Sequence, residues 1–475
     1  MPAPQSAWRT SWAGAPRLSP PPHEVGWGGA DPAEGGPPTA GVHVALRVRP
    51  LLPREAGQRE GVRVHAAERR LVLGDERGHE RAFQADTVLD SRGREAADAL
   101  GASQGAVFRA VGAQLVEHTI GGYNSCLLAH GHTGSGKTHT VLGEGWANGK
   151  EGGATYLGLG REALHAAATG DGAGLLPRAL EAIFAALRED PDAVSIASFF
   201  EIHNERIRDL IAPERVAEDP CSHGSCVCGQ GSAQAPKPVV HFHPRFGAFV
   251  SHVTEVPCRN LDDALRLVSI GAQTRTTAST ALNNRSSRSH AIFTLRIERS
   301  SASNTLMLVD LAGREQERLT QCRTERFKEL TLINRSLFHL TRCIRALAAQ
   351  GGHGAGCAGA GSALGRDSGQ WHHFRNSKLT MVLGHALAGN SRTTVLGTIS
   401  PACSSYEDSL ATLRFCESAK QVRTRPAPAG SRPAVVRELQ LEVRRLEAEL
   451  LRARFGGAPM ERQPGEAQAP AERRR

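Results

Sequence analysis

The chain has 475 residues, of which 40% are hydrophobic and 22% are charged, a composition typical of a globular protein that can bury a large core. It contains no apolar run of about 18 residues, so a membrane-spanning helix is not expected, and its N-terminus lacks the apolar stretch of a secretory signal. The formal net charge of +9 at pH 7 favours an acidic partner, and a dispersed basic surface without such a partner is the alternative.

The cysteines indicate a reducing compartment. Ten of them are scattered along the chain, which predicts free thiols and not a disulfide framework, and the cytoplasm is therefore the expected location. The tightest group brings four potential zinc ligands together, but it lacks a paired C-x₂-C and lies in a stretch rich in glycine, serine and proline, so zinc binding is the less favoured interpretation. These residues are Cys221, His223, Cys226 and Cys228.

Composition divides the chain into a central domain and flanking segments. Residues 1–40 are rich in proline, glycine, alanine and serine and are predicted to be disordered. A series of strand-like and helix-like segments then predicts one large domain over residues 41–422, beginning with an alternating strand. Three glycine-rich stretches without an apolar period are predicted to be surface loops near residues 143–173, 213–238 and 350–370.

Three further segments follow the predicted domain. Residues 423–434 contain Pro426 and Pro428 and are typical of a linker. Residues 435–454 carry leucine and valine at spacings that predict a short amphipathic helix with a coiled-coil seam. Because this seam is shorter than the roughly three to four heptads of a stable coiled coil, a homodimer through the helix and a helix packed against the domain both stay open. Residues 455–475 are predicted to form a disordered tail.

The strongest single motif is a phosphate-binding loop between the strand-like run 126–129 and the helix-like run 139–142. It fits G-x₄-GK[ST] at every required position. In such a loop the backbone N–H groups surround the phosphates, the lysine reaches the β- and γ-phosphates, and the hydroxyl after it ligates Mg²⁺. The residues predicted to bind the phosphates of ATP are Gly131, His132, Thr133, Gly134, Ser135, Gly136, Lys137 and Thr138.

Two other segments supply the partners that a phosphate-binding loop needs. Residues 306–310 form a buried type of strand that ends at Asp310, from which a carboxylate reaches the Mg²⁺ shell. Gly313 follows and is predicted to offer its backbone N–H to the γ-phosphate. The polar run 283–290 precedes another strand-like segment and adds hydroxyls and arginines beside the phosphates.

At these motifs the chain resembles the kinesin superfamily from about residue 42 to residue 422, with the motor near the N-terminus. GHTGSGKTHT at 131–140 looks like the kinesin P-loop, NNRSSRSH at 283–290 like its switch I, and DLAGRE at 310–315 like its switch II. Other segments similar to family motifs fall in the family's order: RVRP at 47–50, GYN at 122–124, FEIHNE at 200–205, INRSL at 333–337 and SKLT at 377–380.

The resemblance implies a three-layer α/β fold of the P-loop NTPase class, with a mixed, mostly parallel central sheet and helices on both faces. It implies that the base of ATP lies against Arg47, Pro50 and His139. It also implies that Mg²⁺ is held by Thr138 and Ser286 directly and by Asp310 through water. The implied cofactors are therefore ATP and Mg²⁺.

The resemblance further implies how the γ-phosphate and the microtubule are contacted. Ser287 and Gly313 would contact the γ-phosphate side, while Arg288 would pair with Glu315 to close the switches and orient the attacking water. Glu315 would accept the proton of that water through a relay. Microtubules would be the partner, bound along the helix around residues 329–347 and the segment after it. The implied contacts are Arg326, Lys328, Arg335, Arg342 and Lys378.

The chain departs from the family pattern at several places. His132 stands where glutamine is usual, Arg314 and Gln316 flank Glu315 in an unusual way, and the stretch 350–370 has no lysine. The linker prolines lack the N–H groups that a docked linker donates, which puts processive movement in doubt.

Two functions of different kinds therefore remain open. A microtubule-stimulated ATPase motor is favoured because the catalytic positions are intact, and a kinesin-like scaffold that holds microtubules with slow or no turnover is the alternative. A P-loop ATPase acting on nucleic acid is not expected, since aromatics are 5% of the chain and no aromatic-basic motif is present. Membrane insertion is not expected either, and the sequence points to no particular cargo.

Overall fold

The computed structural model describes residues 39–93, 103–144, 165–166, 168–211, 237–243, 247–279, 288–299, 302–313, 324–351 and 372–428. Residues 1–38 of the segment predicted over 1–40 lie outside this part of the chain, as do residues 429–434 of the linker and the segments 435–454 and 455–475. The four zinc candidates between Cys221 and Cys228 lie outside it as well. Within α7 the side chains of 324–334 are likewise outside it. Among the helices so described, none combines the length and the apolar character required to cross a bilayer.

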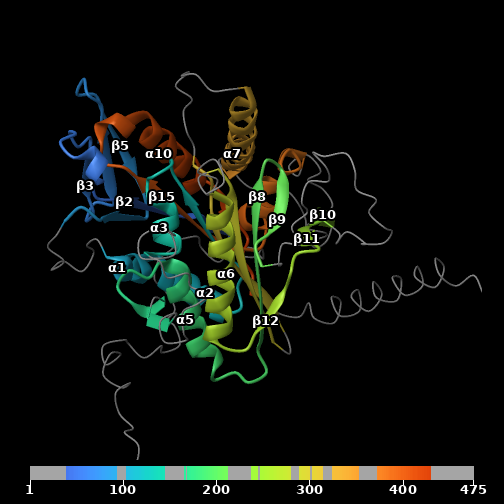
Figure 1. Cartoon of the computed structure of the whole chain (residues 1–475). Helices are drawn as coiled ribbons and strands as arrows, with labels where there is room; N and C mark the ends of the chain where they lie inside the picture. The colour runs from blue at the N-terminus through green and yellow to red at the C-terminus, as the bar shows by residue number, and fades with distance from the viewer. Residues whose placement is uncertain are drawn as a thin grey trace, which may run out of the picture.

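A nine-stranded mixed sheet forms the centre of the molecule (Figure 1). One short strand, β9 (Arg206–Asp209), pairs only with β8. The other strands lie in the spatial order β12 (Val256–Cys258), β8 (Val194–His203), β13 (His290–Glu298), β14 (Ser303–Asp310), β7 (Ser125–His130), β15 (Arg392–Ile399), β2 (His43–Val48) and β6 (Thr87–Asp90).

The sheet is mixed, as the sequence predicts, and its parallel and antiparallel pairs are separated in space. The pairs from β14 through β7, β15 and β2 to β6 are parallel. Those from β12 through β8 and β13 to β14, and the β8–β9 pair, are antiparallel. The expected parallel pairing thus holds for the half that contains the phosphate loop. There β2 and β7 are buried along their whole length, as strands covered on both faces should be.

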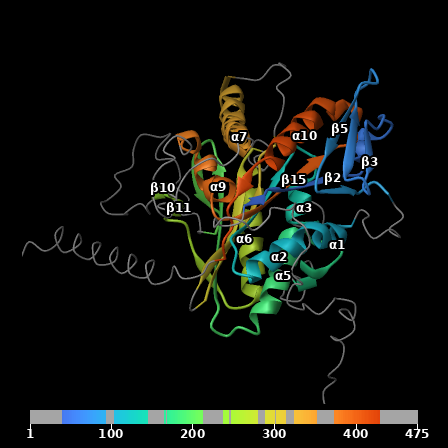
Figure 2. The same ribbon diagram turned by 180° about the vertical axis from the view of Figure 1, so that it is seen from behind.

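Helices cover both faces of the sheet and form two hydrophobic cores (Figures 1 and 2). One face carries α7 (Thr324–Gly351), α9 (Lys378–Ala388) and α10 (Tyr406–Lys420), whose core includes Leu340, Ile344 and Phe415. The opposite face carries α1 (Gln104–Val107), α2 (Ala113–Ile120), α5 (Leu175–Leu187) and α6 (Leu261–Ser279). The π-helical turn η2 (Phe108–Gly112) connects α1 to α2. The three-layer arrangement is the one predicted.

Smaller elements lie around this core. A three-stranded antiparallel sheet is formed by β3 (Val62–His65), β4 (Arg70–Gly74) and β5 (Glu80–Gln84). The hairpin of β10 (Val239–His243) and β11 (Gly247–Ser251) packs near α9. Short turns of 3₁₀ helix occur at η1 (Pro53–Glu55) and η5 (Cys403–Ser405), and α3 (Lys137–Val141) follows the phosphate loop.

A two-residue strand pair joins the two ends of the described domain. β1 (Ala40–Gly41) pairs in antiparallel register with β16 (Arg423–Thr424), so the ordered backbone extends slightly past both predicted boundaries, 41 and 422. After β16, the N–H of Arg425 donates to the carbonyl oxygen of Gly389 at 3.3 Å, and the N–H of Ala427 donates to Oδ1 of Asn390. The linker prolines therefore do not prevent contact with the core, because the residues that alternate with them donate the hydrogen bonds.

Asn390 is expected to hold the start of the linker. In Asn390→Ala the N–H of Ala427 loses its acceptor, so amide exchange in residues 423–428 should become at least several-fold faster, since a lost surface hydrogen bond is worth about 1 kcal/mol. Hydrogen–deuterium exchange with mass spectrometry measures this, with Asn376→Ala as a control at an exposed asparagine before α9. Equal exchange in wild type and Asn390→Ala would contradict the assignment.

Candidate nucleotide site

The phosphate loop has the backbone that its glycines predict. It connects the end of β7 to the start of α3 at Lys137. Gly134 and Gly136 have φ of +80° and +102°, in the left-handed region that favours glycine. A Cβ at Gly131 would lie 2.5 Å from Oγ of Ser135 and 2.6 Å from the carbonyl oxygen of Thr398. Side chains are therefore excluded where the backbone must curve around an anion.

Lys137 closes this loop from inside. Its side chain is buried, and its ammonium group donates to the carbonyl oxygens of Gly131 at 2.9 Å and His132 at 3.0 Å. Ser135 donates to the His132 carbonyl oxygen at 2.8 Å and contacts the Thr398 hydroxyl at 2.6 Å. The loop is thus held in shape by its own side chains, with a positive charge at its centre, which suits a phosphate group.

His132 occupies the loop as a neutral imidazole. Burial, together with the smaller effects of the Lys137 and Arg49 charges, lowers its pKa to about 4. Its Nε2 atom is buried and has no hydrogen-bond partner among the residues that the structure describes. A neutral ring can therefore stand at the usual glutamine position without adding a charge beside Lys137.

The carboxylate of Asp310 is where the phosphate loop and the switch II strand meet. The Thr138 hydroxyl donates to Oδ2 of Asp310 at 2.7 Å. Oδ1 of Asp310 is buried and has no hydrogen-bond partner within the described ranges. A hydroxyl and a carboxylate with a spare buried oxygen are the oxygen donors that Mg²⁺ prefers, so these residues fit that ion.

Arg275 of α6 forms an ion pair with the Asp310 carboxylate, a contact that no sequence motif predicted. Its guanidinium lies 3.3 Å from Oδ2 of Asp310, and both side chains are only 4% exposed. The sequence signal was an arginine near the end of a helix, eight residues before the polar run 283–290. A buried arginine requires a carboxylate partner, but nothing in the spacing identifies which one.

Gly313 brings switch II against the phosphate loop. A Cβ at this position would lie 2.0 Å from Oγ1 and 2.9 Å from the backbone nitrogen of Thr133, so only glycine allows this approach. Arg288 is half-buried. Ser286, Ser287 and Glu315 lie outside the described residues, as do Arg314 and Gln316, so their roles stay predictions.

On the predicted adenine side, Arg47 is buried, and its contact with the base stays a prediction. It is 5% exposed and donates to Ser91, Gln104 and Thr140, at 3.1, 2.9 and 2.9 Å. Gln104 in turn donates to the His139 carbonyl oxygen at 2.6 Å. Arg47 therefore helps to fix the position of α3, directly through Thr140 and indirectly through Gln104. Pro50 is exposed and His139 half-buried; their contact with the base stays a prediction.

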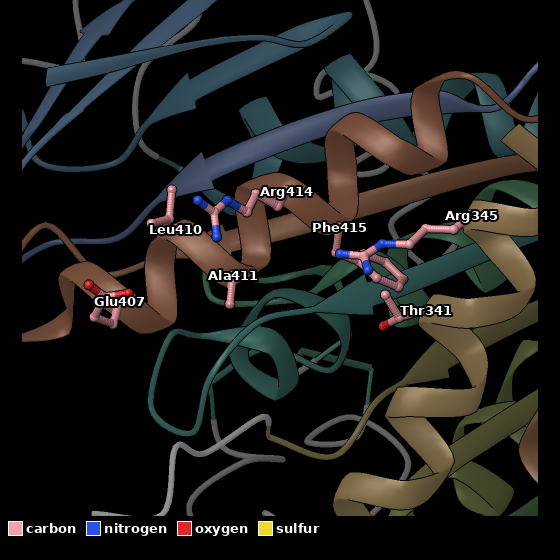
Figure 3. A pocket seen from close by; sticks show the side chains of 7 residues that line it. All are labelled: Thr341, Arg345, Glu407, Leu410, Ala411, Arg414 and Phe415. Atoms are coloured by element: carbon pink, nitrogen blue, oxygen red, sulfur yellow. The ribbon is translucent and has the colours of Figure 1, made fainter. Parts of the chain in front are cut away.

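The strand that leads into the phosphate loop is anchored from the α10 side. The His130 ring stacks on Phe415 of α10, with centroids 3.9 Å apart and planes within 7°. Phe415 also lines a pocket of about 140 Å³ between α7 and α10, where Thr341 and Arg345 face it from α7 (Figure 3). The end of β7 is therefore packed against a helix that itself contacts α7.

The predicted microtubule contacts lie on α7 and at the start of α9. Arg335 and Arg342 are exposed on α7, whereas Lys378 is half-buried and its backbone N–H donates to Glu205 at 2.7 Å. Arg326 and Lys328 belong to α7, but their side chains are outside the described part. No sequence motif marks Phe338 as a surface residue, but it is 58% exposed. The Arg342 guanidinium lies 5.8 Å from its ring centre.

The family profile described as Kinesin motor domain matches residues 47–422, which include every element of this site described above. The chain belongs to the kinesin motor domain family. Members of this family are microtubule-stimulated ATPases that bind nucleotide.

Relatives and solved structures agree with this assignment. The chain is 32% identical to Kinesin-like protein K39 of Leishmania chagasi, over 86% of this chain and 45% of the relative. It is also 32% identical to Chromosome-associated kinesin KIF4 of Xenopus laevis, over 88% of this chain and 30% of the relative. It therefore spans less than half the length of either relative.

Two solved motor domains are similar in structure. A KIF14 dimer in a two-heads-bound state, with AMP-PNP and in complex with a microtubule, superposes with a TM-score of 0.63 and 26% identity, over 84% of this chain and all of that one. A fast kinesin superposes with a TM-score of 0.63 and 27% identity, over 83% of this chain and 95% of that one. The likeness extends across the whole folded domain.

Removal of Arg275 should destabilise this motor domain. Arg275→Ala leaves Asp310 as a buried charge without its arginine, and loss of one partner of such a pair typically lowers the free energy of unfolding by about 3 kcal/mol. Chemical denaturation measures the change. In the double variant Arg275→Ala/Asp310→Asn the loss should be clearly smaller than the sum of the two single losses; additive losses would show that the pair is not coupled.

His132 should make the stability of the motor domain sensitive to acid. Its folded pKa, about 4, is lower than the ordinary value of 6.5. The contribution of neutral His132 to the free energy of unfolding is thus fully present above pH 6.5 and is lost as the pH falls toward 4. At pH 5 the loss relative to pH 7 should be about 2 kcal/mol smaller in His132→Gln than in wild type. An identical pH dependence in wild type and His132→Gln is the contrary result.

Proposed function

We propose that this motor domain couples ATP hydrolysis to microtubule binding and movement, with Mg²⁺ held by Thr138 and Asp310. The observation that carries the proposal is the 2.7 Å hydrogen bond between these two side chains, because it joins the phosphate loop to the strand that leads into switch II. Bound Mg²⁺ would neutralise charge that develops on the phosphate oxygens during transfer.

The residues of the chain act by positioning and by electrostatics. Lys137 and the loop N–H groups hold the phosphates, and the N–H of Gly313 lies where switch II meets the loop. Ser286 is proposed to join the metal ligands, and Ser287 to contact the γ-phosphate. Arg288 is proposed to pair with Glu315, so that the carboxylate orients the attacking water and accepts its proton through a relay.

The microtubule is proposed as the partner on the side of α7 and α9. The exposed guanidinium groups of Arg335 and Arg342 suit an acidic protein surface, and a relative of similar fold has been solved on a microtubule. We propose association with the microtubule cytoskeleton in the cytoplasm, with Arg326, Lys328 and Lys378 as further contacts. Dimerisation through residues 435–454 is part of the same proposal.

A scaffold that holds microtubules with slow or no turnover is the second candidate. The observation that favours it is Arg275, whose guanidinium lies 3.3 Å from the carboxylate that would otherwise serve Mg²⁺ alone. A fixed cation at this carboxylate competes with a metal ion for its charge.

Steady-state ATP hydrolysis by the full chain, with and without polymerised microtubules, separates the two candidates. For a motor, microtubules should raise the rate many-fold, and Lys137→Ala should lower the stimulated rate by at least about 100-fold, since it removes a charge aimed at the transferring phosphoryl group. Glu315→Ala should act in the same direction. Co-sedimentation with microtubules at a flat rate, equal to that of Lys137→Ala, would leave the scaffold.

Contacts through Arg342 should depend on salt. Arg342→Ala should raise the microtubule concentration that gives half-maximal stimulation by several-fold at low ionic strength, because a single interfacial charge acts mainly on association. The difference from wild type should shrink as salt is raised toward 0.15 M, where the Debye length is about 8 Å. An effect of equal size at both ionic strengths would contradict an electrostatic role; Arg266→Ala, on α6, is the control.

A further inference from the structure

One buried histidine makes hydrogen bonds to two other segments of the motor domain. His290 is the last residue of the switch I motif 283–290 and the first residue of β13, and it is 2% exposed. Its Nδ1 accepts the backbone N–H of Ala312, in the turn after β14, at 3.0 Å. Its Nε2 lies 2.8 Å from Oγ of Ser336 on α7. The ring therefore bridges switch II and the helix assigned to the microtubule.

The hydrogen bond from Ala312 settles which ring nitrogen carries the proton. A backbone N–H can only donate, so Nδ1 must be the unprotonated nitrogen and the proton of the neutral ring lies on Nε2. That N–H then donates to the Ser336 hydroxyl. Burial, together with the smaller effects of the Lys137 and Arg275 charges, lowers the pKa of His290 to about 3, so the ring stays neutral at physiological pH. Both bonds persist together in this tautomer.

Each end of this bridge lies at a functional position. Ala312 precedes Gly313, which lies so close to Thr133 of the phosphate loop that a Cβ would not fit. Ser336 is buried and lies between exposed Arg335 and buried Leu337 on α7. A movement of the turn at 311–313 is therefore transmitted through a rigid ring to α7, because neither hydrogen bond can lengthen much without being lost.

We infer that His290 is a positioning residue, which couples the turn at 311–313 to α7 through Ser336 and thereby sets how strongly microtubules stimulate ATP turnover. This inference rests on the proposed function, of which it names one physical link. Ala312 and Ser336, to which His290 is hydrogen-bonded within the described residues, are not reacting groups, so its effect appears in the coupling and not in the chemical step itself.

Ser336→Ala tests the α7 side of the bridge, since it removes the acceptor and leaves the bond to Ala312. Basal ATP turnover should stay within about twofold of wild type, while the ratio of stimulated to basal rate should fall at least about fivefold, the lower end of ordinary coupling between sites. Ser336→Thr keeps a hydroxyl and should restore most of the ratio. Thr341→Val is the matched control: it removes a hydroxyl of the same helix that donates to the Leu337 carbonyl oxygen.

His290→Asn tests the other member of the bridge. The shorter amide can still accept from Ala312 but does not reach α7, so His290→Asn should resemble Ser336→Ala. The double variant should be no worse than either single variant, because both remove the same link. Equal falls in basal and stimulated rates, or additive losses in the double variant, would mean that His290 has only a structural role and would overturn the inference.

A measurement without microtubules separates this inference from the proposed function. Hydrogen exchange in residues 335–347 should differ between the ADP and AMP-PNP states of wild type, and the difference should be lost in Ser336→Ala but kept in Thr341→Val. If wild type shows no microtubule stimulation but the exchange result holds, the proposed function fails and the link stands. If Ser336→Ala keeps the full exchange difference, the link fails whatever the stimulation.

Discussion

The nucleotide site depends on one buried carboxylate. Asp310 ends the central strand β14 and accepts from Thr138 at the end of the phosphate loop, while Arg275 reaches it from α6. A buried charge of this kind is stable only while its partners remain in place. The phosphate loop, β14 and α6 therefore all contact Asp310, and these contacts fix the position of the residues that follow it.

The phosphate site was the part most open to prediction from sequence. Gly134 and Gly136 could be assigned because their left-handed backbone requires glycine, and Thr138 and Asp310 because each directly follows a recognisable element. Contacts formed across long sequence separations were not predictable in the same way. Arg275 and His290 act through partners 35 and 46 residues away, and no local pattern identifies such partners.

Surface features were predicted least well. Arg335 and Arg342 could be proposed from charge alone, but Phe338 departs from the apolar stripe of α7 that contains Leu337, Leu340 and Ile344, and only its exposure distinguishes it from a core residue. The alternation of Pro426 and Pro428 with donating residues likewise became meaningful only when Gly389 and Asn390 were seen beside the linker. In both cases the sequence does not show which residues lie beside the segment in the folded domain.

The pairing of β1 with β16 has a consequence for whatever is attached to this domain. Because the pair is antiparallel and Ala40 lies opposite Thr424, the N-terminal side of β1 and the C-terminal side of β16 lie at the same end of the pair. Segments that are attached near one another on a surface would experience each other at a high effective concentration, of the order of millimolar where they are short and flexible. Weak attraction between an N-terminal extension and a C-terminal one would then suffice to bring them together, within one molecule and without any change in the motor core.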